Sequence, residues 1–100
     1  MALLRIVLRH GFQDDFVTLR VNGAEVFSKP NVRTRYQIDQ ADSLEMDVNQ
    51  NRTEVEIALP QRNLRESVFV NTSSPVALAF SLTESGHIEH SFPDVTHGDL

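Results

Sequence analysis

The sequence predicts an all-β protein: an antiparallel β-sandwich of seven to nine strands that forms a single domain. Turn-forming residues recur at short intervals along its 100 residues. Between them, apolar and polar residues alternate with a period of two, and no stretch shows convincing helical periodicity. The clearest unit is a hairpin in residues 14–27, centred on Asn22-Gly23. A chain of this length can bury about 65% of its unfolded surface. The domain is expected over residues 1–92, followed by a polar tail at residues 93–100.

Each expected strand is an alternating or apolar run that ends at turn residues. From the N-terminus onwards, strands are expected at residues 2–9, 16–21, 24–28, 33–38, 42–48, 53–59, 64–71, 76–82 and 87–92. Pro60 and Pro75 close two of the later strands, because proline cannot donate to a strand ladder. Residues 36–44 leave an alternative open. Asp39 and Asp42 suit a helix cap, so this segment could instead form one helical turn.

The first hairpin has a defined register. Asn and Gly both tolerate the positive φ that a type I′ turn requires, and this turn matches the twist of its strands. The register predicts these cross-strand pairs: Val21 with Ala24, Leu19 with Val26, Val17 with Ser28 and, on the other face, Arg20 with Glu25. Phe16 and Phe27 fall on that outer face. They form a candidate partner-binding patch unless another strand or loop covers them.

A second hairpin is expected in residues 42–59, with its loop near residues 49–52. Its register turns the alternating apolar residues inward and places Met46 opposite Val55. The same register gathers four acidic side chains on the outer face: Glu45, Asp47, Glu54 and Glu56. Like charges directly opposite each other repel, so arginines such as Arg65 (diagonal to Glu56), a divalent cation or a basic partner could neutralise this candidate partner-binding face. A solvated acidic face that blocks edge-to-edge aggregation is the alternative.

Two groups of residues are candidate metal ligands. Asp14 and Asp15 could contribute to a Ca²⁺ site, because loop carboxylates are ligands that Ca²⁺ prefers, although their spacing matches no EF-hand loop. Asp-Asp before a strand is also common turn chemistry. The histidines His87 and His90 are expected on opposite faces of the last strand, so they cannot chelate one ion together. His90 is expected to be partly buried beside Phe80, and no cofactor is expected.

The composition excludes several classes of partner. The chain has a formal net charge of −5 and no basic stripe, which argues against nucleic acid or an anionic membrane. With no cysteine it can form neither disulfides nor Cys-based zinc sites. The first nine residues are interrupted by Arg5 and are too short for a signal peptide or a membrane span. A soluble protein in the cytoplasm is therefore expected.

One further surface, and the absence of enzyme motifs, also bear on function. The outer face of residues 76–82 carries only small side chains, Ala77, Ala79 and Ser81, and could be an exposed strand face or a dimer face. The sequence has no Gly-rich phosphate loop, no G-x-S-x-G elbow and no H-E-x-x-H motif. The chain is therefore not expected to be an enzyme.

The pattern V-N-G-x-x-V at residues 21–26, followed by the threonine-bearing segment 32–34 and alternating strands, resembles the prealbumin-like or PEGA-type small β-sandwiches. The resemblance covers roughly residues 16–71. The start D-D-x-V-x-x-x-V-N-G at residues 14–23 is also similar to that of short bacterial proteins of unknown role. The resemblance implies an Ig-like or prealbumin-like sandwich, and it assigns no functional residue.

The function expected from the sequence is that of a non-enzymatic interaction module, which binds a protein partner or forms a homo-oligomer. The alternative is a carbohydrate-binding sandwich, assisted or not by calcium. Such modules stack sugars on exposed aromatic rings, and here there is no Trp and one Tyr, Tyr36. A small hydrolase is a third hypothesis, because carboxylate pairs arise easily in a chain with 14 acidic residues.

Overall fold

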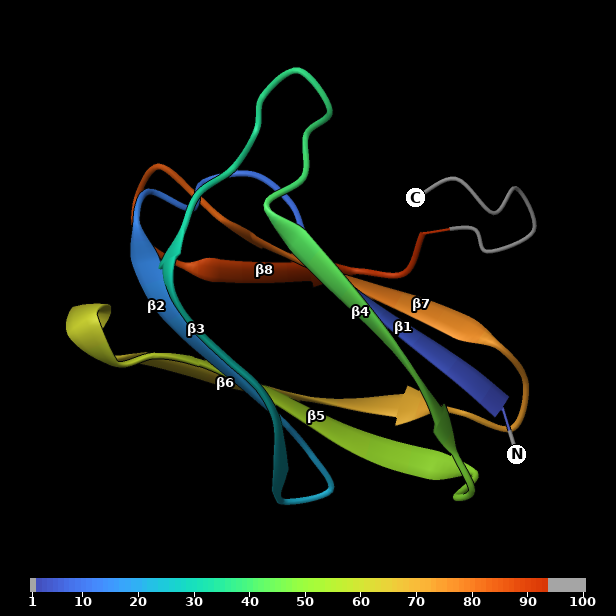
Figure 1. Cartoon of the computed structure of the whole chain (residues 1–100). Helices are drawn as coiled ribbons and strands as arrows, with labels where there is room; N and C mark the ends of the chain where they lie inside the picture. The colour runs from blue at the N-terminus through green and yellow to red at the C-terminus, as the bar shows by residue number, and fades with distance from the viewer. Residues whose placement is uncertain (1, 94–100) are drawn as a thin grey trace.

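The computed structural model of the chain describes residues 2–93, which form two four-stranded sheets packed face to face (Figure 1). The strands are β1 (Ala2–Leu8), β2 (Asp15–Val21), β3 (Ala24–Val32), β4 (Asp42–Val48), β5 (Arg52–Leu59), β6 (Leu64–Asn71), β7 (Val76–Leu82) and β8 (Ile88–Ser91), with a 3-10 turn η1 (Pro60–Arg62) before β6. One sheet has the order β4-β1-β7-β8 and the other β3-β2-β5-β6. The expected all-β, two-sheet architecture is confirmed.

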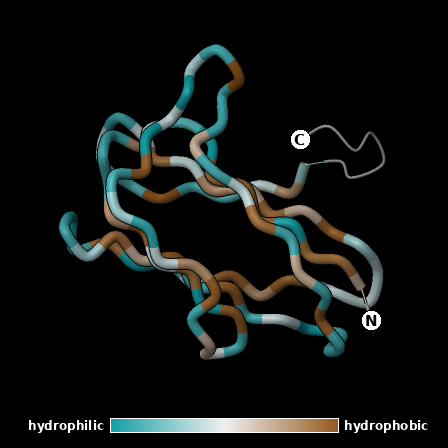
Figure 2. Tube along the Cα trace, viewed as in Figure 1, coloured by the Kyte–Doolittle hydropathy of each residue, from teal (hydrophilic) through white to brown (hydrophobic). Residues whose placement is uncertain are grey.

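The core lies between the sheets, because alternation turns every second side chain of each strand inward. Leu4 and Ile6 of β1 face Val55 and Ile57 of β5 across this interior, and all four are fully buried. Hydrophobic residues follow the strands in both layers, whereas the loops are mostly hydrophilic (Figure 2). Burial of this apolar surface, at about 25 cal/mol per Å², is the main stabilising term.

One pair of strands departs from the expected antiparallel pattern. β1 and β7, at the centre of their sheet, run parallel, with Ile6 beside Leu78. The remaining paired strands are antiparallel. A parallel neighbour requires a crossover connection, and here the chain builds β4 and the whole opposite sheet between β1 and β7.

Eight of the nine expected strands are present, and the expected strand at residues 33–38 is wrong. Residues 36–39 form a turn instead, closed by the Arg35 N–H, which donates to the Gln40 carbonyl at 3.0 Å. The turn is not the alternative helical turn either. No helix within residues 2–93 is long and apolar enough to span a membrane. Most of the expected polar tail, residues 94–100, lies outside the described residues.

The β2–β3 hairpin confirms the expected turn and corrects the register beyond it. Asn22 and Gly23 have φ values of 52° and 84°, as a type I′ turn requires. A bulge follows, so Leu19 pairs with Phe27 instead of Val26. An extra residue on one strand reverses which side chains face inward. Phe27 therefore packs against the core, and its expected place on the outer face is wrong.

The expected hairpin between residues 42 and 59 is also wrong. β4 pairs with β1, whereas β5 pairs with β2 and β6 in the other sheet. Residues 49–51 therefore carry the chain from one layer to the other. Alternation fixes which face of a strand points to the core, but two strands with inward apolar faces can satisfy it side by side or across the sandwich. Met46 of β4 does pack against the core.

Candidate functional site

The four acidic residues of the predicted face lie on two different sheets. Glu45 and Asp47 belong to β4, the edge strand of one sheet, whereas Glu54 and Glu56 belong to β5 in the other. Since the inward positions of both strands pack in the core between the sheets, the acids point to opposite outer faces. The structure thus does not bring them together. Glu56 does have its expected diagonal neighbour, because its Oε2 lies 3.8 Å from Arg65 Nε.

The predicted aromatic pair is separated too. Phe16 lies half-buried on the outer face of β2, where its backbone N–H donates to Gln61 Oε1 at 3.3 Å. Phe27 of β3 packs against the core. The two rings therefore do not form one exposed patch.

Asp14 and Asp15, the candidate Ca²⁺ ligands, each bind a different arginine. Asp15 is buried, and Arg62 donates to both of its oxygens, at 2.6 and 3.1 Å. Asp14 is exposed, and Arg33 Nη2 donates to its Oδ2 at 2.7 Å and to its Oδ1 at 2.8 Å. The side-chain hydrogen bond to its aspartate raises the pKa of each arginine. Nowhere in residues 2–93 do three histidine or acidic side chains gather as a metal site would require.

The β7–β8 hairpin keeps its expected register, with Phe80 opposite His90 and Leu82 opposite Ile88. His90 is nevertheless exposed, against the expected partial burial. It lies on the short edge strand β8, where its ring contacts the edge of Phe92 at a centroid distance of 5.8 Å. The small residues Ala77 and Ala79 on the outer face of β7 are buried, so they do not present an open, flat face for a second sheet.

A different candidate surface lies at the end of the sandwich where the long connections meet. Thr34 is buried there and joins two loops: its Oγ1 donates to the Arg9 carbonyl at 2.7 Å and accepts from the Phe12 N–H at 3.0 Å. The Thr34 N–H also donates to the Phe12 carbonyl at 3.0 Å. The loop before β2 and the loop before β4 are therefore held to one another by three hydrogen bonds.

The β3–β4 loop, residues 33–41, projects beyond the two sheets (Figure 1). Its turn is closed by the Arg35–Gln40 hydrogen bond and by Ile38 N–H donating to the Arg35 carbonyl at 3.1 Å. Asp39 anchors it to the body of the protein through Arg9, at 3.0 Å. On this turn Tyr36 is 66% exposed and Ile38 is 61% exposed. We call these two side chains the loop tip.

A polar cleft of about 440 Å³ lies beside the loop tip. Side chains from four connections line it, and they offer both hydrogen-bond donors and acceptors: His10, Gln13, Tyr36, Arg62, Thr83 and Glu84. Gly11 contributes backbone to the same cleft, with a φ of 93°. The cleft is thus a polar surface bordered on one side by the exposed ring of Tyr36.

His10, one of the side chains that line the cleft, lies between an acid and a hydroxyl. Its Nδ1 is 3.6 Å from Asp39 Oδ1 and 3.5 Å from Ser81 Oγ. A Ser-His-Asp relay needs the acid and the hydroxyl at different ring nitrogens, so that one orients the ring while the other loses its proton. Here both contacts are made to one nitrogen, so these three side chains do not form such a relay.

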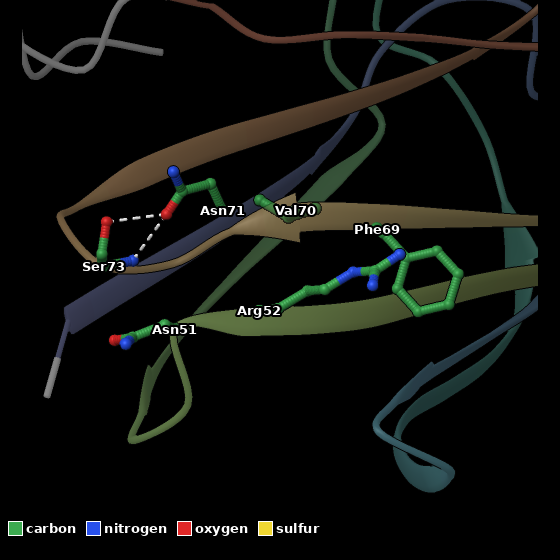
Figure 3. A pocket seen from close by; sticks show the side chains of 6 residues that line it. All are labelled: Asn51, Arg52, Phe69, Val70, Asn71 and Ser73. Carbon is green, nitrogen blue, oxygen red and sulfur yellow. Dashed lines mark hydrogen bonds between the residues drawn. The ribbon is translucent and has the colours of Figure 1, made fainter.

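The opposite end of the sandwich carries a second open depression, of about 510 Å³, lined by Asn51, Arg52, Phe69, Val70, Asn71 and Ser73 (Figure 3). The guanidinium of Arg52 lies over the ring of Phe69, 4.1 Å from its centroid. Phe69 is 56% exposed on the outer face of β6. Sequence reasoning missed both this stack and the loop tip.

The chain matches no family model, no curated protein and no solved structure.

Proposed function

We propose that the protein is a non-enzymatic interaction module that binds a protein partner through the loop tip, Tyr36 and Ile38. The observation that carries this proposal is the exposure of two large side chains, 66% and 61%, on one closed turn. Aromatic anchors that enter a pocket of the partner dominate the energetics of many protein interfaces. Burying each of these two side chains in a partner would contribute roughly 1.5–3 kcal/mol.

The hydrogen bonds that order the β3–β4 loop support its proposed role in binding a partner. A flexible loop loses conformational entropy when a partner orders it, and this loss reduces affinity. Here the turn is closed by backbone hydrogen bonds, its base is joined to a neighbouring loop through Thr34, and Asp39 is paired with Arg9. Most of the β3–β4 loop is therefore already ordered before a partner binds. The polar cleft beside Tyr36 would form the hydrated rim that surrounds the apolar centre of an interface.

The proposal includes a prealbumin-like type of sandwich. Its support is the strand order, in which parallel β1 and β7 are flanked by β4 and β8 in one sheet, with β3-β2-β5-β6 in the other. Self-association remains one form that the interaction could take. A cytoplasmic location, and the lack of nucleic acid or membrane partners, stay predictions from the composition.

The test is affinity capture from the native host with the wild type and with the double variant Tyr36→Ser/Ile38→Ser, with protein identification by mass spectrometry. Phe92→Ser is the matched control, because it removes an exposed apolar side chain elsewhere. We expect a partner that the control retains and the double variant loses by about tenfold or more. Sedimentation of the purified protein separates self-association from a foreign partner. Equal retention of every partner by the double variant would contradict the proposal.

A second candidate is carbohydrate binding, and one observation favours it. The exposed ring of Tyr36 borders a cleft whose side chains can both donate and accept hydrogen bonds. An aromatic face beside convergent polar groups is suited to a sugar ring. A glycan array probed with the wild type and with Tyr36→Ala, each with and without chelator, decides between the two. Binding of defined glycans that Tyr36→Ala abolishes would favour the sugar, and loss with chelator would add a calcium requirement.

A further inference from the structure

We propose that the depression around Arg52 and Phe69 is a second binding site, specific for a single carboxylate attached to an apolar group, as at the C-terminus of a peptide. The site lies at the end of the sandwich opposite to the loop tip, so the inference is independent of the proposed function. Figure 3 shows the guanidinium of Arg52, at the start of β5, extending across the face of the Phe69 ring on β6.

The register explains why the two side chains stack. Arg52 pairs directly with Asn71, and Phe69 lies two residues earlier on β6, which is the diagonal position. Long side chains reach one another at this distance across a sheet. The stack is a cation–π contact of the kind worth roughly 0.5–1 kcal/mol at an exposed site. It places the guanidinium against the ring, and both residues line the depression.

Arg52 is available to a ligand. Within residues 2–93 it takes part in no ion pair, whereas Arg9, Arg33, Arg62 and Arg65 each contact an acidic side chain. A guanidinium presents its donors in a planar fork that matches a carboxylate with two parallel hydrogen bonds. A stacked arginine without an acidic partner is therefore arranged to receive a carboxylate.

The floor of the depression is preorganised by two turns that are joined to one another. Thr72 Oγ1 donates to the Gln50 carbonyl at 2.6 Å, and the Thr72 N–H donates to the Asn51 carbonyl at 2.9 Å. Beside them, Asn71 Oδ1 accepts from both the N–H and the Oγ of Ser73, at 3.0 and 2.7 Å (Figure 3). Because its oxygen already accepts two hydrogen bonds, the Asn71 side chain has only its N–H groups left for a further partner.

Charge selects a carboxylate over a phosphate. The site holds one guanidinium, Glu54 follows two residues along the same face of β5 opposite Phe69, and the chain has a net charge of −5. A dianion would meet more repulsion than one arginine offsets, whereas a single negative charge is matched. The exposed part of the Phe69 ring supplies an apolar surface for the group that carries the carboxylate.

The test is an NMR titration of the full chain with small probes, following backbone amide shifts. N-acetyl-phenylalanine carries the C-terminal carboxylate, its amide is the neutral counterpart, N-acetyl-glutamic acid α-amide carries a side-chain carboxylate, and phenyl phosphate is the dianion. We expect N-acetyl-phenylalanine to shift the amides around Phe69 and Asn71 with a Kd on the order of 1–10 mM. The neutral amide and phenyl phosphate should bind at least about fivefold more weakly. Comparable binding of the glutamate probe would contradict the requirement for an apolar group beside the carboxylate.

Two arginine variants provide the decisive comparison. Arg52→Gln should weaken binding of N-acetyl-phenylalanine by about tenfold, because it removes the charge-assisted fork. Arg65→Gln removes the same charge from the outer face of β6 but outside the depression, and should change the Kd by less than about twofold. The proposal is overturned by equal binding of the neutral amide, by tighter binding of phenyl phosphate, by equal losses in the two variants, or by no shift at about 20 mM probe. The loop-tip variant Tyr36→Ser/Ile38→Ser should leave this titration unchanged.

Discussion

At one end of the sandwich the chain turns in long connections, at residues 9–14, 33–41 and 83–87, whereas at the other end it turns within residues 22–23, 49–51 and 72–75. Both ends use a buried threonine to join neighbouring connections, Thr34 at the loop end and Thr72 at the turn end. Only the loop end has enough chain to project apolar side chains beyond the sheets. The two proposed binding surfaces differ accordingly, because the loop tip projects from a closed turn and the depression lies on a sheet face.

The largest expected effect comes from two glycines, one at each end. Gly11 has a φ of 93°, and a Cβ at this position would collide with the backbone of Leu82. Gly23 has a φ of 84° but nothing around it. We expect Gly11→Ala to lower the free energy of unfolding by about 3 kcal/mol or more, through strain and collision together. Gly23→Ala carries only the left-handed strain, about 1–2 kcal/mol.

Urea denaturation of both glycine variants measures these losses. If Gly11→Ala were as stable as Gly23→Ala, the close contact between residue 11 and the end of β7 would not be a determinant of the loop end. The wild type and Gly86→Ala, another glycine in open space with a positive φ, serve as references.

The next effect compares the two buried threonines. Thr34→Val leaves the Phe12 N–H and the Arg9 carbonyl unpaired, and Phe12 is fully buried. We expect a loss of about 2–3 kcal/mol, because buried backbone groups without partners keep their full desolvation cost. Thr72→Val frees the Gln50 carbonyl and the buried Thr53 hydroxyl. Gln50 is exposed, so water can replace one bond, and about 1–2 kcal/mol is expected.

Thermal unfolding of the two valine variants gives the comparison, and Thr53→Val is the internal control. Since Thr72 donates its proton to Gln50, Thr53 is the donor in the hydroxyl pair, at 2.8 Å. The double variant Thr53→Val/Thr72→Val should therefore lose little more than Thr72→Val alone. Additive losses would show that the two hydroxyls act separately.

The sequence predicts eight of the strands, but it does not predict which strands are neighbours in the sheets. The sequence predicts residues 42–48, 64–71 and 76–82 with the observed bounds, because each of these runs is bounded by turn residues or begins after a proline. The place of β4 beside β1 was not predictable in this way, because alternation reports the face of a strand and not its partner. The bulge at Val26 was missed for a related reason. A tight turn fixes the first cross-strand pairs, and an extra residue further along leaves the local pattern unchanged.

The candidate surfaces were harder to predict than the strands. Tyr36 and Ile38 alternate with polar residues as they would in a strand, which is why residues 33–38 were expected to be one. Their exposure depends on Asp39 pairing with Arg9, 30 residues away, and on Thr34 joining two loops. The stack of Arg52 on Phe69 depends on the β5–β6 register, which residues far apart in the sequence determine together.

The smallest expected effect, that of Arg33→Gln, belongs to a comparison of the two arginine–aspartate pairs of the loop end. Arg62→Gln removes the partner of buried Asp15 and should cost about 1–3 kcal/mol, less than for a fully buried pair because Arg62 is partly exposed. Arg33→Gln removes the partner of exposed Asp14 and should leave stability unchanged within error, because exposed ion pairs contribute little. Each aspartate raises the pKa of its arginine, so deprotonation of the arginine removes either contribution as the pH rises far above neutral. Denaturant midpoints should therefore show the same difference between the variants at pH 6 and pH 8, roughly within the error of the extrapolation.

High salt should leave the Arg62→Gln loss largely in place, since buried pairs are screened less than exposed ones. Equal losses in the two variants would mean that burial of Asp15 does not distinguish the pairs. In that case the ion pair between η1 and β2 would not be what holds Arg62 in place at the cleft beside Tyr36.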